Sequence, residues 1–550
     1  MRKVLMFVFA MCLSLAAVGV MAQSQTTGSI EGTVTDPQGN AVPGVTVNVT
    51  SPNLISAQSA VSDDSGRFRI LNLPPGRYEV KVDANAAGKG FAEFSKGDVE
   101  VNLSRTSSVD VQLQVGGVSG TVTVTDTAGA AVDTSSNTTG TNVSREQFEN
   151  FPTQRTVQSL YTISPSVARS GLRDASGRDR DPSVAGSSGP ENNYILDGVT
   201  TTDPAFGGSG ANLPFEFVQE VEIKTGAYGA EYGKSTGGIF NVITKSGGNR
   251  FTGDIFGYFG SKSMVRSTEN FPFTGLAPDG FSEIDAGIDI GGPIIKDKLW
   301  FFGAFNPQRR KNFFLTQTLR QPVENQITTP FYSGKLTWAV NSANVFTFST
   351  FGDSTKQEGH LFPLAGFEAN LASSRGVIET GGTNYAFRVN SNITPTWIGE
   401  FSLGLHFQRA NTLPELANET LVTDRFAVLR AGAVLPVTET TVFSAGGLRL
   451  AFVEGTGGTV QRNFVRSGFG LQSEQDRNRW EIAARLQNIY GRHTIKYGFE
   501  YAVNLYGIDT KSTGPALNFA SGNPAGPHRI ENRFAICSRT STTTITCPSA

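Results

Sequence analysis

From residue 251 onward, apolar and polar side chains alternate along short runs, a period that fits β-strands. In RNRWEIAARL (477–486) and IKYGFEYAVNLYG (495–507), every second side chain is apolar, so each strand would have one apolar face. No stretch beyond the N-terminal segment is apolar over the length of a membrane helix, so strands would make any membrane crossing. The candidate strands are 251–261, 284–291, 299–310, 331–340, 344–353, 383–391, 397–410, 478–488 and 492–507.

The connections between these strands alternate between long and short. The short ones are 292–298, 341–344, 392–396 and 490–493. Outer-membrane barrels have this asymmetry, with short periplasmic turns and long outer loops, whereas a soluble propeller or sandwich rarely has it. Aromatic residues near the strand ends are expected to form girdles at the membrane surfaces: Trp300, Phe301, Phe302, Trp338, Phe346, Trp397 and Trp480. The net charge of −2 gives no basis for a nucleic-acid partner.

The N-terminus predicts export from the cytoplasm. Arg2 and Lys3 precede an apolar run over 4–22, which ends in Ala22 before the polar Gln23. A basic start, an apolar run and a small-residue cleavage site are typical of a secretory signal peptide, here residues 1–22. The alternative is an uncleaved anchor helix, because the run approaches the length that spans a bilayer.

Residues 27–115 predict a small β-sandwich. GSIEGTVTDPQGNAVPGVTVNVT and DDSGRFRILNLPPGRYEVKV each contain two short strands separated by Gly- and Pro-rich turns. These stretches resemble the carboxypeptidase regulatory-like domain, a transthyretin-like sandwich. The resemblance implies a binding or spacer module without catalysis.

A secreted peptidase is a weakly supported alternative. His528-Arg529-Ile530-Glu531 has the spacing of a zinc-binding pair, but no histidine follows it to complete the set. We interpret the match as coincidence, and we predict no catalytic, cofactor or metal site and no enzymatic activity.

Residues 120–248 predict a small α+β domain. Ser144 and Gln147 form a capping-box pattern, so one or two short helices are expected from there to about Tyr161. The runs 192–199 and 218–226 are expected strands of a mixed sheet, and 166–190 is an expected loop.

Three motifs in this segment, ILDGV, VEIKTGAYGAEYG and GGIFNVITK, together resemble the plug domain of TonB-dependent outer-membrane receptors. The matching residues are Asp197, Gly198, Gly226, Tyr228, Tyr232, Gly233, Gly237, Gly238, Asn241, Thr244 and Lys245. A plug inside a barrel must pack tightly, and we expect the glycines to allow backbone-close turns with positive φ. GGPIIKDKLWFFGAFN also resembles the first hairpin of the Oar-like branch, which has the same N-terminal sandwich. The expected fold is mainly β: sandwich, small α+β plug, and a transmembrane antiparallel β-barrel over 250–550.

This barrel is expected to be incomplete. At about ten residues per strand, and with a possible extra hairpin in 411–477, residues 250–550 hold at best about eleven strands. Plugged transporters of this kind need about 22 strands. A fragment or truncated product is therefore expected.

The resemblance implies energised uptake of a ligand across the outer membrane of a bacterium. TonB would pair with an exposed strand ahead of the plug, for which the candidate is Thr121, Val122, Thr123, Val124 and Thr125. This segment is equally consistent with a last sandwich strand or a linker. The expected partners are TonB, outer-membrane lipid and an extracellular siderophore, oligosaccharide or peptide, contacted by loops such as 166–190 and 200–214. The alternative is an adhesion or assembly protein with the same fold.

Cys537 and Cys547 bracket the polar tract SRTSTTTIT after the last expected strand. Strand counting places this tract in an extracellular loop, in an oxidising compartment. We predict a disulfide between them, and the alternative is a pair of free thiols.

Overall fold

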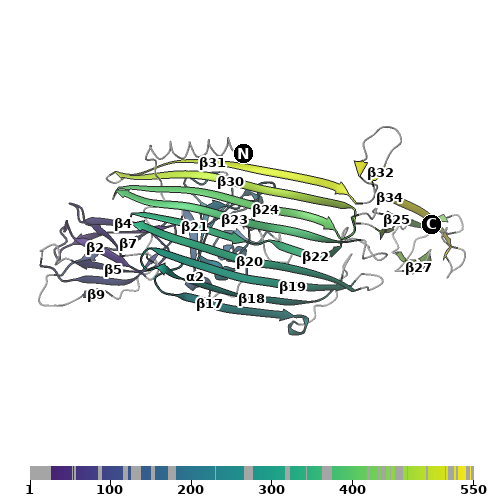
Figure 1. Ribbon diagram of the computed structural model, residues 1–550, viewed down its shortest axis with the longest axis horizontal. Coiled ribbons are helices and arrows are strands. Elements are labelled where there is room, and N and C mark those ends of the chain that lie inside the picture. Colours follow the sequence, from purple (N-terminus) through teal and green to yellow (C-terminus); the bar gives the residue numbers. More distant parts are fainter. Residues whose placement is uncertain are drawn as a thin grey trace.

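The computed structural model contains a sandwich, a plug and a curved wall of long strands, in chain order (Figure 1). It describes residues 26–51, 54, 57–83, 90–114, 122–124, 138–149, 155–170, 181–229, 231–233, 235–265, 277–315, 322–341, 343–361, 374–394, 396–417, 422–430, 433–434, 441–445, 448–452, 462–467, 469–490, 493–513, 516–517, 526–527, 531–539 and 545–546. The predicted signal peptide and the His528 pair lie outside these ranges, apart from Glu531.

The sandwich consists of two sheets whose valine-rich faces pack together. One sheet has the order β4-β1-β7, with β8 also paired to β1, and the other has the order β3-β2-β5-β6-β9. The strands are β1 (Gly28–Thr35), β2 (Thr46–Thr50), β3 (Gln58–Val61), β4 (Arg67–Leu73), β5 (Gly76–Asp83), β6 (Phe94–Val101), β7 (Thr106–Ser108), β8 (Val111–Gln112) and β9 (Val122–Val124). Alternation along β2 buries Val47 and Val49 between the sheets, as expected from the sequence.

The plug, residues 138–247, is a five-stranded mixed sheet in the order β10-β15-β16-β13-β14. Its strands are β10 (Thr139–Ser144), β13 (Asn193–Leu196), β14 (Val199–Thr200), β15 (Val218–Gly226) and β16 (Ile239–Thr244). Its helices are α2 (Arg145–Phe148), α3 (Val157–Tyr161), η1 (Gly189–Glu191) and η2 (Phe215–Phe217). The expected capping box forms, since the Ser144 backbone N–H donates to Gln147 Oε1 at 3.1 Å. The expectation of a loop over 166–190 is partly wrong, because β11 (Val167–Ala168) pairs with β12 (Ser183–Val184).

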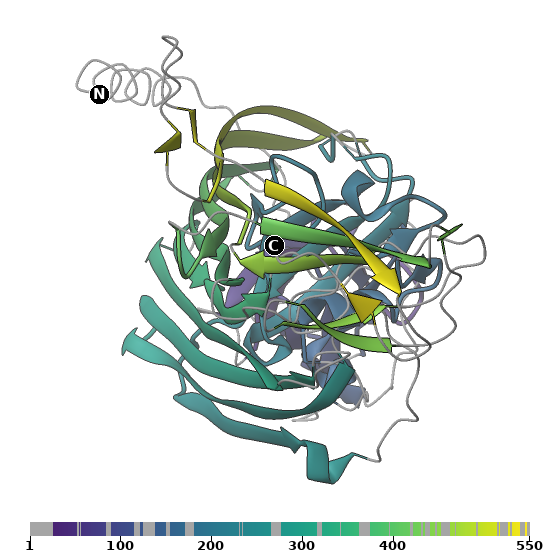
Figure 2. The same cartoon turned by 90° about the vertical axis from the view of Figure 1, so that its right-hand side faces the viewer.

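The wall is one antiparallel sheet in the order β17-β18-β19-β20-β21-β23-β24-β30-β31, with β22 between β20 and β23. Its strands are β17 (Thr252–Ser261), β18 (Ala277–Ile295), β19 (Leu299–Leu315), β20 (Pro322–Asn341), β21 (Asn344–Gly352), β22 (Thr355–Leu361), β23 (Arg375–Thr394), β24 (Trp397–Pro414), β30 (Leu471–Tyr490) and β31 (His493–Ser512); the short helix η3 (Lys262–Met264) follows β17. All nine candidate strands are present, and most are longer than expected. The wall curves around one side of the plug (Figure 2).

All four short connections lie at the end of the wall that carries the sandwich (Figure 1). The expectation of an extra wall hairpin in 411–477 is wrong, because β24 pairs directly with β30. The chain between them instead forms β25 (Val422–Arg430), β26 (Ala433–Val434), β27 (Thr441–Ala445), β28 (Leu448–Phe452) and β29 (Arg462–Ser467). With β32 (Ala516–Leu517), β33 (Gly526–Pro527), β34 (Glu531–Arg539) and β35 (Ile545–Thr546), these make small sheets at the opposite end of the wall.

The outer face of the wall is apolar in the half next to the short turns and polar beyond it. On β20 the outward residues pass from Trp338 and Leu336 to Gln326 and Glu324. This change defines a band suited to lipid next to a stretch suited to water. The girdle expectation is wrong for Trp300 and Phe302, which are buried and point inward.

Among the described residues, no helix has both the length and the apolar character needed to cross a membrane.

Candidate functional site: the plug and its contacts

The ILDGV motif forms the tight turn between β13 and β14. Leu196 pairs with Val199, so Asp197 and Gly198 are the two turn residues, with φ of 49° and 80°. Positive φ at both positions is the geometry that Asp-Gly provides in two-residue hairpins. The turn presents the Asp197 carboxylate to Thr244 at the end of β16: the Thr244 N–H and Oγ1 donate to it at 3.0 and 2.6 Å.

The same carboxylate holds the plug to the wall. Lys335 of β20 donates from Nζ to Asp197 Oδ1 at 2.8 Å and to the Thr244 carbonyl oxygen at 2.8 Å. Arg388 of β23 donates to the Asp197 carbonyl oxygen. All of these groups are buried. Burial alone would raise the pKa of this carboxyl. The charge of Lys335 and the hydrogen bonds from Lys335 and Thr244 outweigh burial, so the pKa of Asp197 lies below its usual value.

Lys245, the last motif residue, makes a second contact between plug and wall. Its Nζ lies 2.9 Å from Asp289 Oδ2 of β18 and 3.1 Å from Asp254 Oδ2 of β17. Arg145 of α2 approaches the same Asp254 at 2.8 Å. The Thr-Lys ending of the motif therefore secures both the plug turn and the first wall hairpin.

Arg155 provides a third contact, which the sequence did not single out. Its guanidinium lies 2.5 Å from Glu216 and 3.0 Å from Asp285 of β18, and 3.3 Å from the centroid of the Tyr258 ring on β17. This half-buried guanidinium thus lies within ion-pair distance of two carboxylates and over an aromatic ring.

Further contacts lie toward the end of the wall that is distant from the sandwich. Arg477 of β30 pairs with Asp203 at 2.5 Å, and its guanidinium also lies 4.7 Å from the Phe206 ring centroid. Asp353 sits in the break between β21 and β22, where its Oδ2 accepts from the Asn212 N–H at 2.7 Å. These contacts position the expected loop 200–214 against the wall.

The motif glycines allow close packing more than they provide positive φ. Gly226, Gly233, Gly237 and Gly238 all have φ outside the left-handed region, and Gly198 alone among the motif glycines has positive φ. A Cβ on Gly237 would lie 2.4 Å from Asn192 Oδ1, and one on Gly238 would lie 2.7 Å from Val184 Cγ2. Close packing explains these two glycines, whereas a Cβ on Gly233 would meet nothing within 4 Å.

The remaining motif residues pack around the Gly-rich turn. Tyr232 is buried against Ile195 and Ile239, with Tyr228 at its edge. Asn241 is fully buried, and its Nδ2 donates to Glu222 Oε2 at 3.1 Å. The structure therefore brings the three sequence motifs together around β13, β15 and β16.

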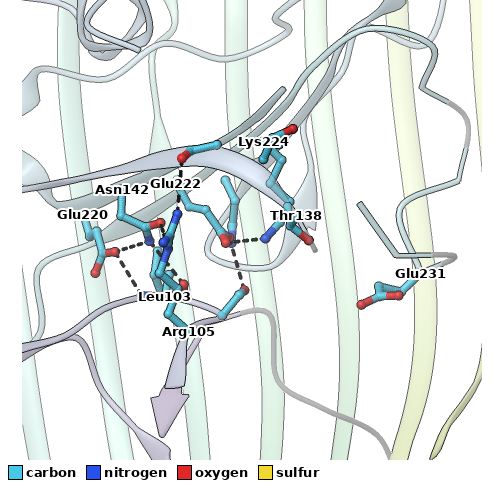
Figure 3. A network of polar contacts seen from close by, with 12 residues as sticks. Leu103, Arg105, Thr138, Asn142, Glu220, Glu222, Lys224 and Glu231 are labelled. Atoms are coloured by element: carbon cyan, nitrogen blue, oxygen red, sulfur yellow. Dashed lines mark hydrogen bonds and ion pairs between the residues drawn. The ribbon is translucent and has the colours of Figure 1, made fainter. Parts of the chain in front are cut away.

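Sequence reasoning missed the charged face of β15. Glu220, Glu222 and Lys224 alternate with Val221 and Ile223, a pattern that suggests a solvent-exposed face. All three charged residues are instead at most 5% exposed. The sandwich turn at Leu103 covers Glu220 and Glu222 (Figure 3), whereas Lys224 lies against Glu222 and 5.0 Å from the Tyr232 ring centroid. The alternation was visible in the sequence, but the contact between the sandwich and β15 was not.

The candidate coupling segment pairs within the sandwich. Val122–Val124 form β9, an edge strand parallel to β6, with Phe94 opposite Val122 and Lys96 opposite Val124. This arrangement matches the alternative of a last sandwich strand. Thr121 and Thr125 lie outside the described residues.

The cysteine pair is partly described. Cys537 lies in β34, whose backbone pairs antiparallel with β35 at Ser538–Thr546 and Arg539–Ile545. Cys547 lies outside the described residues, so the disulfide remains a prediction.

A cavity of about 470 Å³ separates the plug from β30 and β31. The plug contributes Thr200 and Glu231 to its lining, and the wall contributes Arg479, Arg485 and Glu500. This lining mixes charged side chains of both signs with apolar and aromatic ones such as Tyr497 and Phe499.

A small sheet seated inside a curved, lipid-compatible wall defines the class of plugged outer-membrane barrel. Three family models match the chain: "Carboxypeptidase regulatory-like domain" over 29–114, "TonB-dependent Receptor Plug Domain" over 131–239 and "Outer membrane beta barrel domain" over 243–320. These matches confirm the resemblance to TonB-dependent receptors with an N-terminal regulatory-like domain. They also support localisation to the outer membrane.

Two known proteins are similar to this chain. The TonB-dependent transporter Oar of Myxococcus xanthus is 28% identical over 604 residues, which cover 95% of this chain and 55% of that protein. The crystal structure of the outer membrane transporter YddB from Escherichia coli aligns with a TM-score of 0.50 at 12% identity, covering 68% of this chain and 48% of that one. The second match shows the fold alone. The chain spans about half the length of each protein.

Proposed function

We propose that this chain provides the plug and part of the barrel of a receptor that takes up a ligand through the outer membrane, energised by TonB. The observation that carries the proposal is the seating of the plug. Its contacts with the wall include several discrete ion pairs, such as Lys335–Asp197, Lys245–Asp289 and Arg477–Asp203. Because these groups can be rehydrated, the plug can shift without the wall unfolding.

The proposed coupling element is Val122–Val124 with its neighbours Thr121 and Thr125. As an edge strand, β9 has one side free of sheet partners among the described strands. Edge strands accept an added strand through their backbone groups, which is the mode proposed for TonB. The match to the TonB-dependent transporter Oar over most of this chain supports TonB as the partner.

The proposed route for the ligand runs beside the plug, through the cavity next to β30 and β31. Its mixed lining of Arg479, Arg485, Glu231 and Glu500 suits a polar, hydrogen-bonding ligand. Siderophore, oligosaccharide and peptide all meet this description. No cofactor and no catalytic step are part of the proposal.

A comparison of spent growth media tests uptake without knowledge of the ligand. Cells with and without the gene are grown with and without a protonophore, and mass spectrometry identifies the compounds that disappear. Uptake predicts compounds that only energised cells carrying the gene deplete. A defect in attachment or surface assembly, with identical media in all four cultures, would instead support the adhesion alternative.

A further inference from the structure

The sandwich and the plug meet through polar groups. Apolar packing divides the molecule differently: one buried cluster contains sandwich residues such as Val47 and Tyr78, and another joins plug residues such as Phe217 to wall residues such as Phe302. The plug therefore shares its apolar core with the wall, whereas the sandwich has its own.

The contact between the two domains is the charged face of β15. The turn after β6 covers this face: the Leu103 N–H donates to Glu220 Oε1 at 2.9 Å, and Ser104 Oγ donates to Glu222 Oε2 at 3.2 Å (Figure 3). Lys224 pairs with Glu222 from the same strand. Two carboxylates and an ammonium group are thereby buried with partners for each charge.

Asn142 on β10 links the two domains at the same place. Its Nδ2 donates to Glu220 Oε1 at 2.6 Å and to the Leu103 carbonyl oxygen at 3.1 Å. Its Oδ1 accepts from Arg105 Nε at 2.8 Å, and the same guanidinium donates to the Gly140 carbonyl oxygen at 3.2 Å. A further sandwich contact with the plug, Arg77 with Glu146 at 2.8 Å, is exposed and also ionic.

A surface of this kind is suited to separation. Burial of charge is costly, and an interface that never opens gains more stability from apolar side chains of similar volume. When such a face is uncovered, water replaces the lost hydrogen bonds and no apolar patch is left exposed. The period-two placement of Glu220, Glu222 and Lys224 on the side of β15 opposite Val221 and Ile223 makes this surface compatible with both states.

We propose that the sandwich is a reversible cap on the plug, held by Glu220 and Glu222, and that its release uncovers a hydrophilic surface at the periplasmic end of the plug. We assign the uncovered surface to ligand exit, and this assignment rests on the uptake function proposed above. The mobility of the sandwich does not depend on that function, and it can be measured without ligand or TonB.

Glu220 makes the docking sensitive to pH. Burial raises the pKa of its carboxyl to about 8, against the hydrogen bonds from Asn142 and Leu103, and the nearby Glu222 and Glu100 act in the same direction as burial. Arg105 and Lys224 are the cations of this interface. In the released state Glu220 is hydrated and titrates near its ordinary value. Docking is therefore favoured by protonation: this contribution is complete below about pH 4.5 and is lost as the pH rises through about 8.

The test is a distance measurement between two spin labels on the full chain in detergent micelles. Gln38→Cys lies in an exposed turn of the sandwich, and Lys296→Cys lies in an exposed turn of the wall. Cys12→Ser, Cys537→Ser and Cys547→Ser remove the native thiols. At pH 6 one narrow distance population is expected. A second, broader population should grow toward pH 9, by up to about tenfold in the population ratio for each pH unit below 8.

Two variants assign the effect. Glu220→Gln keeps the acceptor oxygen but cannot titrate, so its distance distribution should not change with pH. Glu31→Gln, which alters a carboxylate paired with Arg69 inside the sandwich, should retain the response of the parent protein. A single unchanged population in the parent at every pH would overturn the reversible cap, and a pH response that survives Glu220→Gln would overturn the role of Glu220. If the sandwich is mobile but the comparison of growth media shows no energised uptake, the uptake proposal fails and the reversible cap stands.

Discussion

The Nζ of Lys335 lies 2.8 Å from Asp197 Oδ1 and 2.8 Å from the Thr244 carbonyl oxygen, so one cation on the wall holds the turn before β14 and the end of β16 together. The two plug segments already bond to each other through the Thr244 N–H and hydroxyl. The motif residues Asp197 and Thr244 thus form one buried polar unit, and its charge is balanced from outside the plug.

Lys335→Met should loosen the plug. Removing one partner leaves the Asp197 carboxylate buried beside a neutral side chain, a loss of about 3–5 kcal/mol for a buried pair. The urea concentration at which the plug becomes sensitive to protease, measured by pulse proteolysis of the whole chain, should fall. Lys356→Met is the matched control, because its pair with Glu358 at 2.7 Å is exposed and screened by water, so its removal should leave the midpoint nearly unchanged. Equal midpoints for the two variants would contradict the buried-anchor interpretation.

Gly198→Ala should destabilise the plug, and Gly233→Ala should not. Gly198 has φ of +80°, and an added Cβ would also lie 3.2 Å from the Arg388 guanidinium. The left-handed conformation alone costs a non-glycine residue about 1–2 kcal/mol. Gly233 has no positive φ, and a Cβ there would meet nothing within 4 Å, so alanine at this position tests the same motif without backbone strain or a steric clash. Thermal unfolding followed by the near-ultraviolet circular dichroism of buried tyrosines measures both, and similar losses at the two positions would show that the constraint is absent.

Val122→Pro or Val124→Pro should prevent TonB coupling. Proline removes the backbone N–H that an added strand requires, and its ring disfavours regular pairing. Val122→Ala and Val124→Ala keep the N–H and are the matched controls. Co-purification of the full chain with the periplasmic domain of TonB provides the measurement. If both proline variants bind TonB as the alanine variants do, the coupling element lies elsewhere in the chain.

Cys537 and Cys547 should form a disulfide. The antiparallel register of Ser538 with Thr546 and Arg539 with Ile545 would, if continued by one step, place position 547 opposite Cys537. Directly opposed cross-strand positions are close enough for the bond. A closed loop of about ten residues would be stabilised by about 3 kcal/mol. The unreduced protein is unfolded, alkylated and weighed; incorporation of two labels would show free thiols and refute the bond.

The wall was the most predictable part of the chain. Long runs with period two, such as 477–486, have a strong local signal, and the short turns between strands fix which neighbours pair. Strand ends were less predictable because pairing continues beyond the lipid band, where the outward residues become polar and the alternation disappears. In β20, Glu324 and Gln326 face outward in the same ladder as Leu336, and the local hydrophobicity of the sequence did not indicate that the strand extends to them.

The plug contacts were predictable in identity but not in role. The motif pointed to Asp197, Thr244 and Lys245, whereas their partners Lys335, Asp289 and Arg388 come from distant strands without a local signature. The tight packing expected at Gly237 and Gly238 is present without the expected positive φ, and the neighbours that create it, such as Asn192, are brought near only by the folded sheet. The burial of Glu220 and Glu222 could not be foreseen, because it depends on how one domain sits on another.

The length of the wall strands determines how far the wall extends beyond the outer surface of the membrane. β20, β23, β30 and β31 each contain 20 residues. About 9–11 tilted residues are enough to cross the bilayer, so roughly half of each strand stands beyond the lipid. At about 3.4 Å per residue and a tilt of about 45°, the rim is roughly 25 Å above the membrane surface. The first contact with a large extracellular molecule would therefore be made by polar protein surface that stands clear of the lipid.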